Sequence, residues 1–113
     1  MEQHYKLDRV RDLAGGDDDF VAAIAATFIE EVPEDAELLE QAVKDLDYKQ
    51  AYQSAHKMKP TIELFDLGVF DDLIVVQDWG KFEKVGQDCT KELATVLAAV
   101  KQASAEIQVD FNL

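Results

Sequence analysis

One histidine lies among lysines in a chain that is otherwise strongly acidic. The chain has 24 acidic and 11 basic residues, which give a formal net charge of −13. Residues 48–62 nevertheless contain three lysines and no acid, and His56 lies between Lys49 and the pair Lys57 and Lys59. An imidazole can act as a nucleophile, and a lysine ammonium stabilises phosphate as a point charge. This pattern predicts a site that binds an anion, and the anion we favour is a phosphoryl group.

The histidine is predicted to lie on the exposed face of a helix that runs from an N-cap at Asp47 to about Asp66. Residues three and four positions apart share a helix face. One face is apolar and is expected to join the core: Ala51, Ala55, Met58, Ile62 and Phe65. The other face carries His56 and six neighbours: Lys49, Tyr52, Gln53, Lys59, Pro60 and Glu63. The alternative to a reactive His56 is a histidine that is packed or exposed and has no chemical role.

We assign two roles on this face. Lys59, one turn beyond His56, is expected to stabilise a phosphoryl group attached to the imidazole. The remaining neighbours, together with Lys57, are expected to form the surface that faces a partner, with Tyr52 and Pro60 as its apolar part.

Pro60 is the unusual member of this helix. Its missing N–H would have bonded the carbonyl of His56, and a proline inside a helix costs about 3 kcal/mol relative to alanine. On an exposed face, water can bond the freed carbonyl and a bend can relieve the clash of the ring. A short side chain at position 60 also lets a partner approach the imidazole.

The rest of the chain also reads as helices. Further helices are predicted at four places: Tyr5 to Ala14, a long segment after Asp17–Asp19, Phe70 to Trp79, and Gln87 to Gln108. Pro33 predicts either a kink in the long segment or two helices end to end. Gly80 and Gly86 are expected to bracket a loop, although residues 81–85 could extend the helix before them. The predicted fold is all-α, a single domain over residues 1–113 built as an antiparallel four-helix bundle with a short extra N-terminal helix.

Several side chains outside the histidine helix are expected to be structural. A solvated charged face explains one group of acids: Glu30, Glu31, Glu34, Asp35 and Glu37. Leu7, Val10 and Leu13 form the apolar side of the first helix. Trp79 and Phe82 are expected in the core or at helix seams, and Cys89 as a small buried hydrophobic residue.

Composition and motifs limit the function classes. A pI near 4.3 argues against nucleic acid and anionic membranes as partners. No stretch approaches the roughly 18 apolar residues of a membrane span, the N-terminus does not resemble a secretory signal, and the single cysteine fits a reducing cytoplasm. Met1 and clean ends to the predicted bundle favour a free protein.

No second chemistry is supported by the motifs. Cys89 is alone and His4 is expected in a mobile terminus, so zinc is unsupported, and Gln53 stands where a di-iron bundle needs glutamate. Neither Ser54 nor Cys89 has an identifiable histidine partner for a nucleophilic triad. No glycine-rich nucleotide loop is present, so we expect no ATP binding and no kinase activity.

These residues resemble the histidine-containing phosphotransfer (HPt) family of multistep phosphorelays, whose motif is commonly A-H-x-x-K-G. Residues 55–59, Ala-His-Lys-Met-Lys, carry the motif, and residues 7–17, 28–33 and 47–48 follow the family's order. The resemblance implies that His56 is the phosphoacceptor and that Lys59 supports the phosphoryl group. It further implies exchange with aspartates on the receiver domains of response regulators and of a hybrid sensor kinase. Those receivers would supply Mg²⁺ and most of the catalysis, so the chain itself is expected to be a monomeric carrier without a cofactor.

The chain departs from the family pattern at three places, and two of these departures, Pro60 and Glu63, keep an alternative open. Pro60 replaces the usual glycine, Glu63 places an acid where a small residue is preferred, and Leu67-Gly68 falls about two residues later than usual. The alternative function is a helical protein-interaction module that keeps the bundle and is not phosphorylated.

Overall fold

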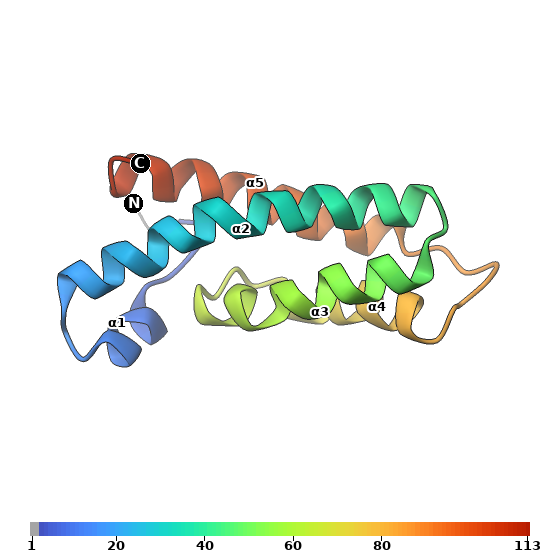
Figure 1. Ribbon diagram of the computed structural model, residues 1–113, viewed down its shortest axis with the longest axis horizontal. Coiled ribbons are helices and arrows are strands. Elements are labelled where there is room, and N and C mark those ends of the chain that lie inside the picture. The colour runs from blue at the N-terminus through green and yellow to red at the C-terminus, as the bar shows by residue number, and fades with distance from the viewer. Residues whose placement is uncertain (1–2) are drawn as a thin grey trace.

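The computed structural model describes residues 3–113, and these residues form helices and no strand (Figure 1). Five helices follow one another along the chain: α1 (Asp8–Ala14), α2 (Asp18–Lys44), α3 (Tyr48–Leu64), α4 (Phe70–Lys81) and α5 (Thr90–Asp110). The prediction of an all-helical chain is therefore confirmed.

The four longer helices contact one another in a closed order. α3 packs against α2 and α4, α5 packs against α2 and α4, and α1 packs against α2. Only Asp45, Leu46 and Asp47 join α2 to α3, so these two helices run side by side in opposite directions (Figure 1). This arrangement leaves one side of α3 without a neighbouring helix.

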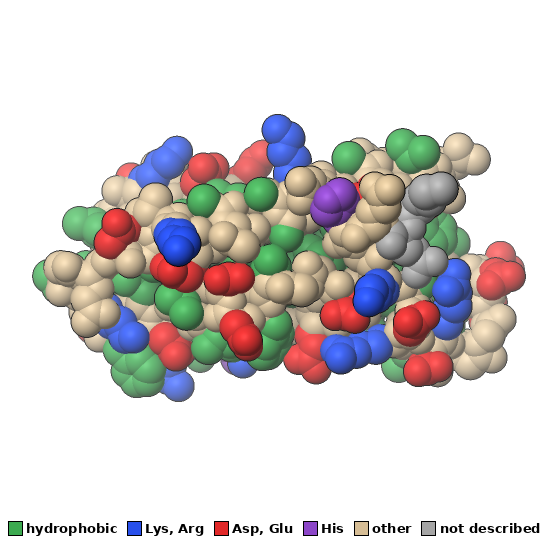
Figure 2. Space-filling model, turned by 180° about the vertical axis from the view of Figure 1, so that it is seen from behind, with side chains coloured by type: hydrophobic (Ala, Val, Ile, Leu, Met, Phe, Trp, Pro, Cys, Tyr) green, Lys and Arg blue, Asp and Glu red, His purple; other side chains and the backbone are tan. Residues whose placement is uncertain are grey.

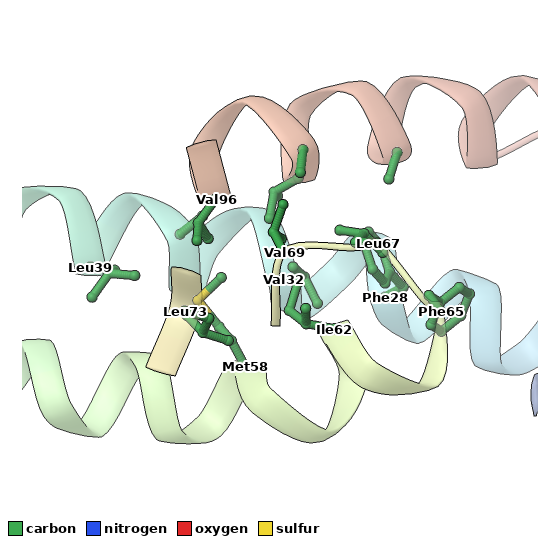
Figure 3. Close-up of a cluster of buried hydrophobic side chains, with 14 of the residues drawn as sticks. Phe28, Val32, Leu39, Met58, Ile62, Phe65, Leu67, Val69, Leu73 and Val96 are labelled. Carbon is green, nitrogen blue, oxygen red and sulfur yellow. The ribbon is translucent and has the colours of Figure 1, made fainter. Parts of the chain in front are cut away.

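The space between the helices is filled by one cluster of buried apolar side chains (Figure 3). The rings of Phe28 in α2 and Phe65 after α3 pack with centroids 4.8 Å apart. The predicted apolar face of the histidine helix is buried at every position: Ala51, Ala55, Met58, Ile62 and Phe65. Burial of this face orients α3, and that orientation fixes which of its side chains reach solvent.

The first helix is shorter than the prediction. It begins at Asp8 rather than Tyr5, because the preceding residues bond elsewhere: the backbone N–H of Lys6 donates to the carbonyl of Phe65 at 2.8 Å. α1 ends at Ala14, and its C-cap is Gly15, whose φ of 63° is left-handed. Of the three apolar residues predicted at helical spacing here, Leu7 and Val10 are buried, whereas Leu13 is 63% exposed.

Pro33 lies inside a single helix. α2 is continuous from Asp18 to Lys44, and the alternative of two helices end to end is wrong. The buried side chains of Val32 and Ala36 hold the segment on both sides of the proline against the core. Packing thus offsets the hydrogen bond that the proline removes.

The boundaries around α3, α4 and α5 differ from the prediction by a few residues. α3 ends at Leu64, and α4 continues past Trp79 to Lys81, so Gly80 is inside a helix and does not begin a loop. α5 begins at Thr90, whose N–H donates to the Asp88 carboxylate at 2.8 Å.

Two of the three structural assignments near these boundaries are confirmed. Trp79 and Cys89 are buried. Phe82 is 61% exposed because it follows the end of α4, so its placement in the core or a seam is wrong.

The surface mixes charge with apolar side chains. On the face seen in Figure 2, acidic and basic groups alternate and the negative charge is not gathered into one patch. Within residues 3–113, no helix is both long enough and apolar enough to cross a membrane.

Candidate functional site

His56 projects from the middle of α3 into solvent, as predicted. Its imidazole stacks on the ring of Tyr52, one helical turn earlier, with the centroids 5.4 Å apart and the planes at 25°. The stacking holds one face of the imidazole against a half-buried side chain and leaves the rest of the ring accessible.

The turn that carries Tyr52 lies directly on the backbone of α4. A Cβ atom at Gly80 would lie 2.6 Å from the carbonyl oxygen of Tyr48 and 2.7 Å from the nitrogen of Tyr52, so only glycine fits there. The ring of Trp79 packs on that of Tyr48 with centroids 4.6 Å apart. Sequence reasoning missed this contact, because it placed Gly80 at the start of a loop rather than inside the helix.

Lys57 does not lie with the other lysines. Its Nζ donates to the carboxylate of Asp35 in α2 at 3.2 Å. Asp35 is only 5% exposed, so its assignment to a solvated acidic face is wrong. The hydrogen bond and the charge of Asp35 raise the pKa of Lys57 above its usual value, and burial only partly opposes this effect. Lys57 therefore ties α3 to α2 beside His56.

Lys59 and Pro60 lie next to the imidazole along α3. Lys59 is half-buried, and among the described residues it has no ion-pair partner. Pro60 is exposed, and the helix continues beyond it to Leu64. The carbonyl of His56 therefore lacks the helical N–H that residue 60 would have supplied.

Glu63 contacts α1. The guanidinium of Arg9 donates to the carbonyl oxygen of Glu63 at 3.1 Å and lies 3.9 Å from its carboxylate. Sequence reasoning did not assign Arg9 to the site, because the contact depends on how α1 folds back on the end of α3. Lys49 and Gln53, the remaining predicted members, are exposed on α3.

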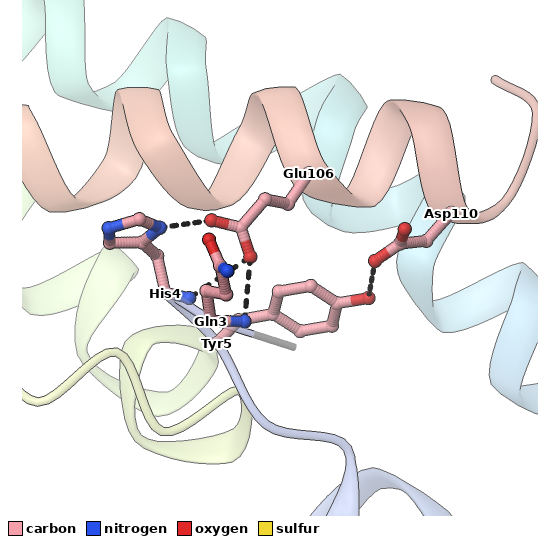
Figure 4. A network of polar contacts seen from close by, with 5 residues as sticks. All are labelled: Gln3, His4, Tyr5, Glu106 and Asp110. Carbon is pink, nitrogen blue, oxygen red and sulfur yellow. Dashed lines mark hydrogen bonds and ion pairs between the residues drawn. The ribbon is translucent and has the colours of Figure 1, made fainter. Parts of the chain in front are cut away.

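The N-terminal segment, residues 3–5, is bound to α5, so His4 is not in a free terminus (Figure 4). The backbone N–H groups of Gln3 and His4 donate to the Glu106 carboxylate at 2.9 and 3.0 Å, and the ring of His4 also contacts it. Burial disfavours the ionised carboxylate, but these hydrogen bonds outweigh it and lower the pKa of Glu106. The hydroxyl of Tyr5 donates to Asp110 at 2.7 Å.

Residues 3–113 bring together no group of three or more His, Cys, Asp or Glu side chains that could hold a metal ion. Core packing does not account for the exposed imidazole of His56, and Lys59 follows it by one helical turn along α3.

Comparisons of the chain with models of protein families, with curated proteins and with solved structures found no match.

Proposed function

We propose that the protein is a phosphoryl carrier that accepts a phosphoryl group on His56 from a receiver-domain aspartate and passes it to a second receiver. One observation carries the proposal: the imidazole is exposed and stacked on Tyr52, and Lys59, one helical turn further along α3, has no ion-pair partner among the described residues. A nucleophile that is accessible and beside an uncommitted cation suits a group that carries two negative charges.

The proposed step is a transfer between two side chains. The lone pair of the unprotonated ring nitrogen attacks phosphorus, a P–N bond forms, and the P–O bond to the aspartate breaks with its electrons left on the carboxylate. The other ring nitrogen keeps its proton. The reverse reaction on a second aspartate delivers the phosphoryl group, so no oxidant or water is consumed.

The chain's own residues account for holding the phosphoryl group and not for fast chemistry. Lys59 is a single, partly exposed point charge, and a contact of this kind is worth up to about 1 kcal/mol. We therefore assign most of the catalysis, and the Mg²⁺ it needs, to the receiver domain. We also infer that the four longer helices form the antiparallel bundle that the HPt resemblance implies, with α1 as the short extra helix.

Transfer from phosphorylated receiver domains tests this function. A panel of receivers, phosphorylated with radiolabelled acetyl phosphate and Mg²⁺, is mixed with the wild type and with His56→Gln. We expect label on the wild type that is labile in acid and stable in alkali, and none on His56→Gln. Equal labelling of the two proteins would show that the site is assigned wrongly.

The second candidate is an interaction module that is never phosphorylated. Two contacts favour it: Lys57 is committed to Asp35, and Glu63 adds a carboxylate to the histidine face. Binding of a receiver to the wild type and to His56→Gln with equal affinity, without any transfer of label, would support this candidate.

A further inference from the structure

At the proposed site, the carboxylate of Glu63 could compete with a phosphoryl group for the ammonium of Lys59. It is the only acid in α3, and it lies four residues after Lys59. Side chains with opposite charges at this spacing form ion pairs along a helix. Such a pair would draw the ammonium of Lys59 toward Glu63, away from His56, which lies three residues before it.

In the structure, Glu63 interacts with a residue of another helix instead. Arg9 of α1 lies 3.9 Å from the Glu63 carboxylate and also donates to the carbonyl of the same residue at 3.1 Å. The three side chains Arg9, Lys59 and Glu63 line one surface depression together with Pro60 and Leu64. Within the described part of the chain, the carboxylate pairs with Arg9 and not with Lys59.

We propose that Arg9 is a positioning residue of the phosphoryl site. It holds the Glu63 carboxylate and thereby keeps the ammonium of Lys59 available to a phosphoryl group on His56. A guanidinium suits this role because its fork of donors can bond the carbonyl and face the carboxylate at once. The inference rests on the proposed function for its phosphoryl part, whereas the competition for Glu63 does not depend on it.

The competition can be measured without any phosphoryl group. The rate at which an N-hydroxysuccinimide ester acylates Lys59, followed by peptide mass spectrometry, reports whether its amine is paired. In Arg9→Gln we expect this rate to fall roughly two- to fivefold at low salt, the range of an exposed ion pair. The double variant Arg9→Gln with Glu63→Gln should regain the wild-type rate, and Arg9→Lys should largely keep it.

The same variants are then phosphorylated chemically with phosphoramidate, which needs no receiver. The lifetime of the phosphohistidine should shorten in Arg9→Gln by a similar factor and recover in the double variant. Lys91→Gln removes the same charge from the exposed surface of α5 and serves as the control. The effects should fade as salt is added, because Arg9 and Glu63 are 56% and 57% exposed.

Two results would overturn the inference: an unchanged acylation rate of Lys59 in Arg9→Gln, or a reduced rate that Glu63→Gln does not restore. The proposed function fails separately. If the acylation rate of Lys59 changes as expected but no receiver labels the wild type, the role of Arg9 in holding Glu63 is supported and the proposed phosphoryl-carrier function is wrong.

Discussion

At the scale of single residues, the lysines around His56 have different tasks. Lys57 and Lys59 lie on either side of Met58, and the sequence predicts that Lys57 faces a partner and that Lys59 stabilises a phosphoryl group. Helical phase and the burial of Asp35 separate them: Lys57 is bound to α2, and Lys59 stays on the histidine face. The two lysines should therefore respond differently to substitution.

Replacing Lys59 with alanine should affect the phosphoryl group and not the fold. Lys59→Ala is expected to shorten the lifetime of phosphohistidine by roughly two- to fivefold, since one partly exposed cation is lost. The lifetime is measured by phosphorus NMR after treatment with phosphoramidate, and the thermal midpoint by circular dichroism. A large drop in the midpoint would mean that Lys59 is structural.

Replacing Lys57 with methionine should affect stability in a way that depends on pH. The folded-state pKa of Lys57 is raised above 10.5, so its contribution is complete below the unfolded pKa and is lost as pH rises through the folded one. Near pH 8 we expect Lys57→Met to unfold at lower urea than the wild type. The two curves should converge as pH rises through the folded-state pKa of Lys57, and Lys91→Met should show no such trend. A gap that is constant across this range would contradict the ion pair.

At the scale of elements, α3 is positioned by contacts that come from distant parts of the chain. Gly80 of α4 touches the first turns of α3. At the other end of α3, Lys6 bonds the carbonyl of Phe65, and Arg9 of α1 bonds the carbonyl of Glu63. The helices themselves could be predicted from periodicity and caps, since Asp17 and Asp47 accept the amide bonds expected of N-caps. The contacts between helices could not, because periodicity and caps describe each helix separately and do not determine how one helix approaches another.

The close approach of α4 predicts a clear effect of Gly80→Ala. The new Cβ would overlap the backbone of Tyr48 and Tyr52, and overpacking costs roughly 1–3 kcal/mol, only partly offset by the better helix propensity of alanine. Urea unfolding gives the loss, and amide chemical shifts show where α3 moves. Gly86→Ala, in open space, should leave the shifts of α3 unchanged. A Gly80→Ala variant as stable as the wild type would contradict this packing.

The N-terminal segment should detach in acid. Because the pKa of Glu106 is lowered, its ionised form stabilises the segment above its unfolded value of 4.5, and this stability is lost as pH falls through the folded pKa. The amide signals of Gln3 and His4 should report detachment below about pH 4.5 in the wild type.

In Glu106→Gln this pH dependence should be absent, whereas Glu92→Gln, elsewhere on α5, should keep it. An unchanged titration of the two amides in Glu106→Gln would show that another group controls the segment.

At the scale of the whole molecule, the apolar face of α3 is buried in the single core, and its opposite face, which carries His56, is exposed to solvent. The all-helical class and the outward direction of His56 could be predicted, because both follow from the spacing of apolar residues in α3. The burial of Asp35 and the role of Arg9 could not, because each depends on a second helix. The proposed carrier function combines these scales: a helix held by the core, an exposed imidazole, and a lysine without an ion-pair partner among the described residues.

The central claim is tested most directly by identifying the phosphorylated atom. The protein, labelled with ¹⁵N at histidine, is mixed with a phosphorylated receiver domain and Mg²⁺ and observed by phosphorus and nitrogen NMR. The account predicts a P–N coupling on a ring nitrogen of His56 that disappears when an unphosphorylated second receiver is added. A coupling on His4 would contradict it. So would the absence of any coupling on the protein while every receiver tested keeps its own phosphoryl group.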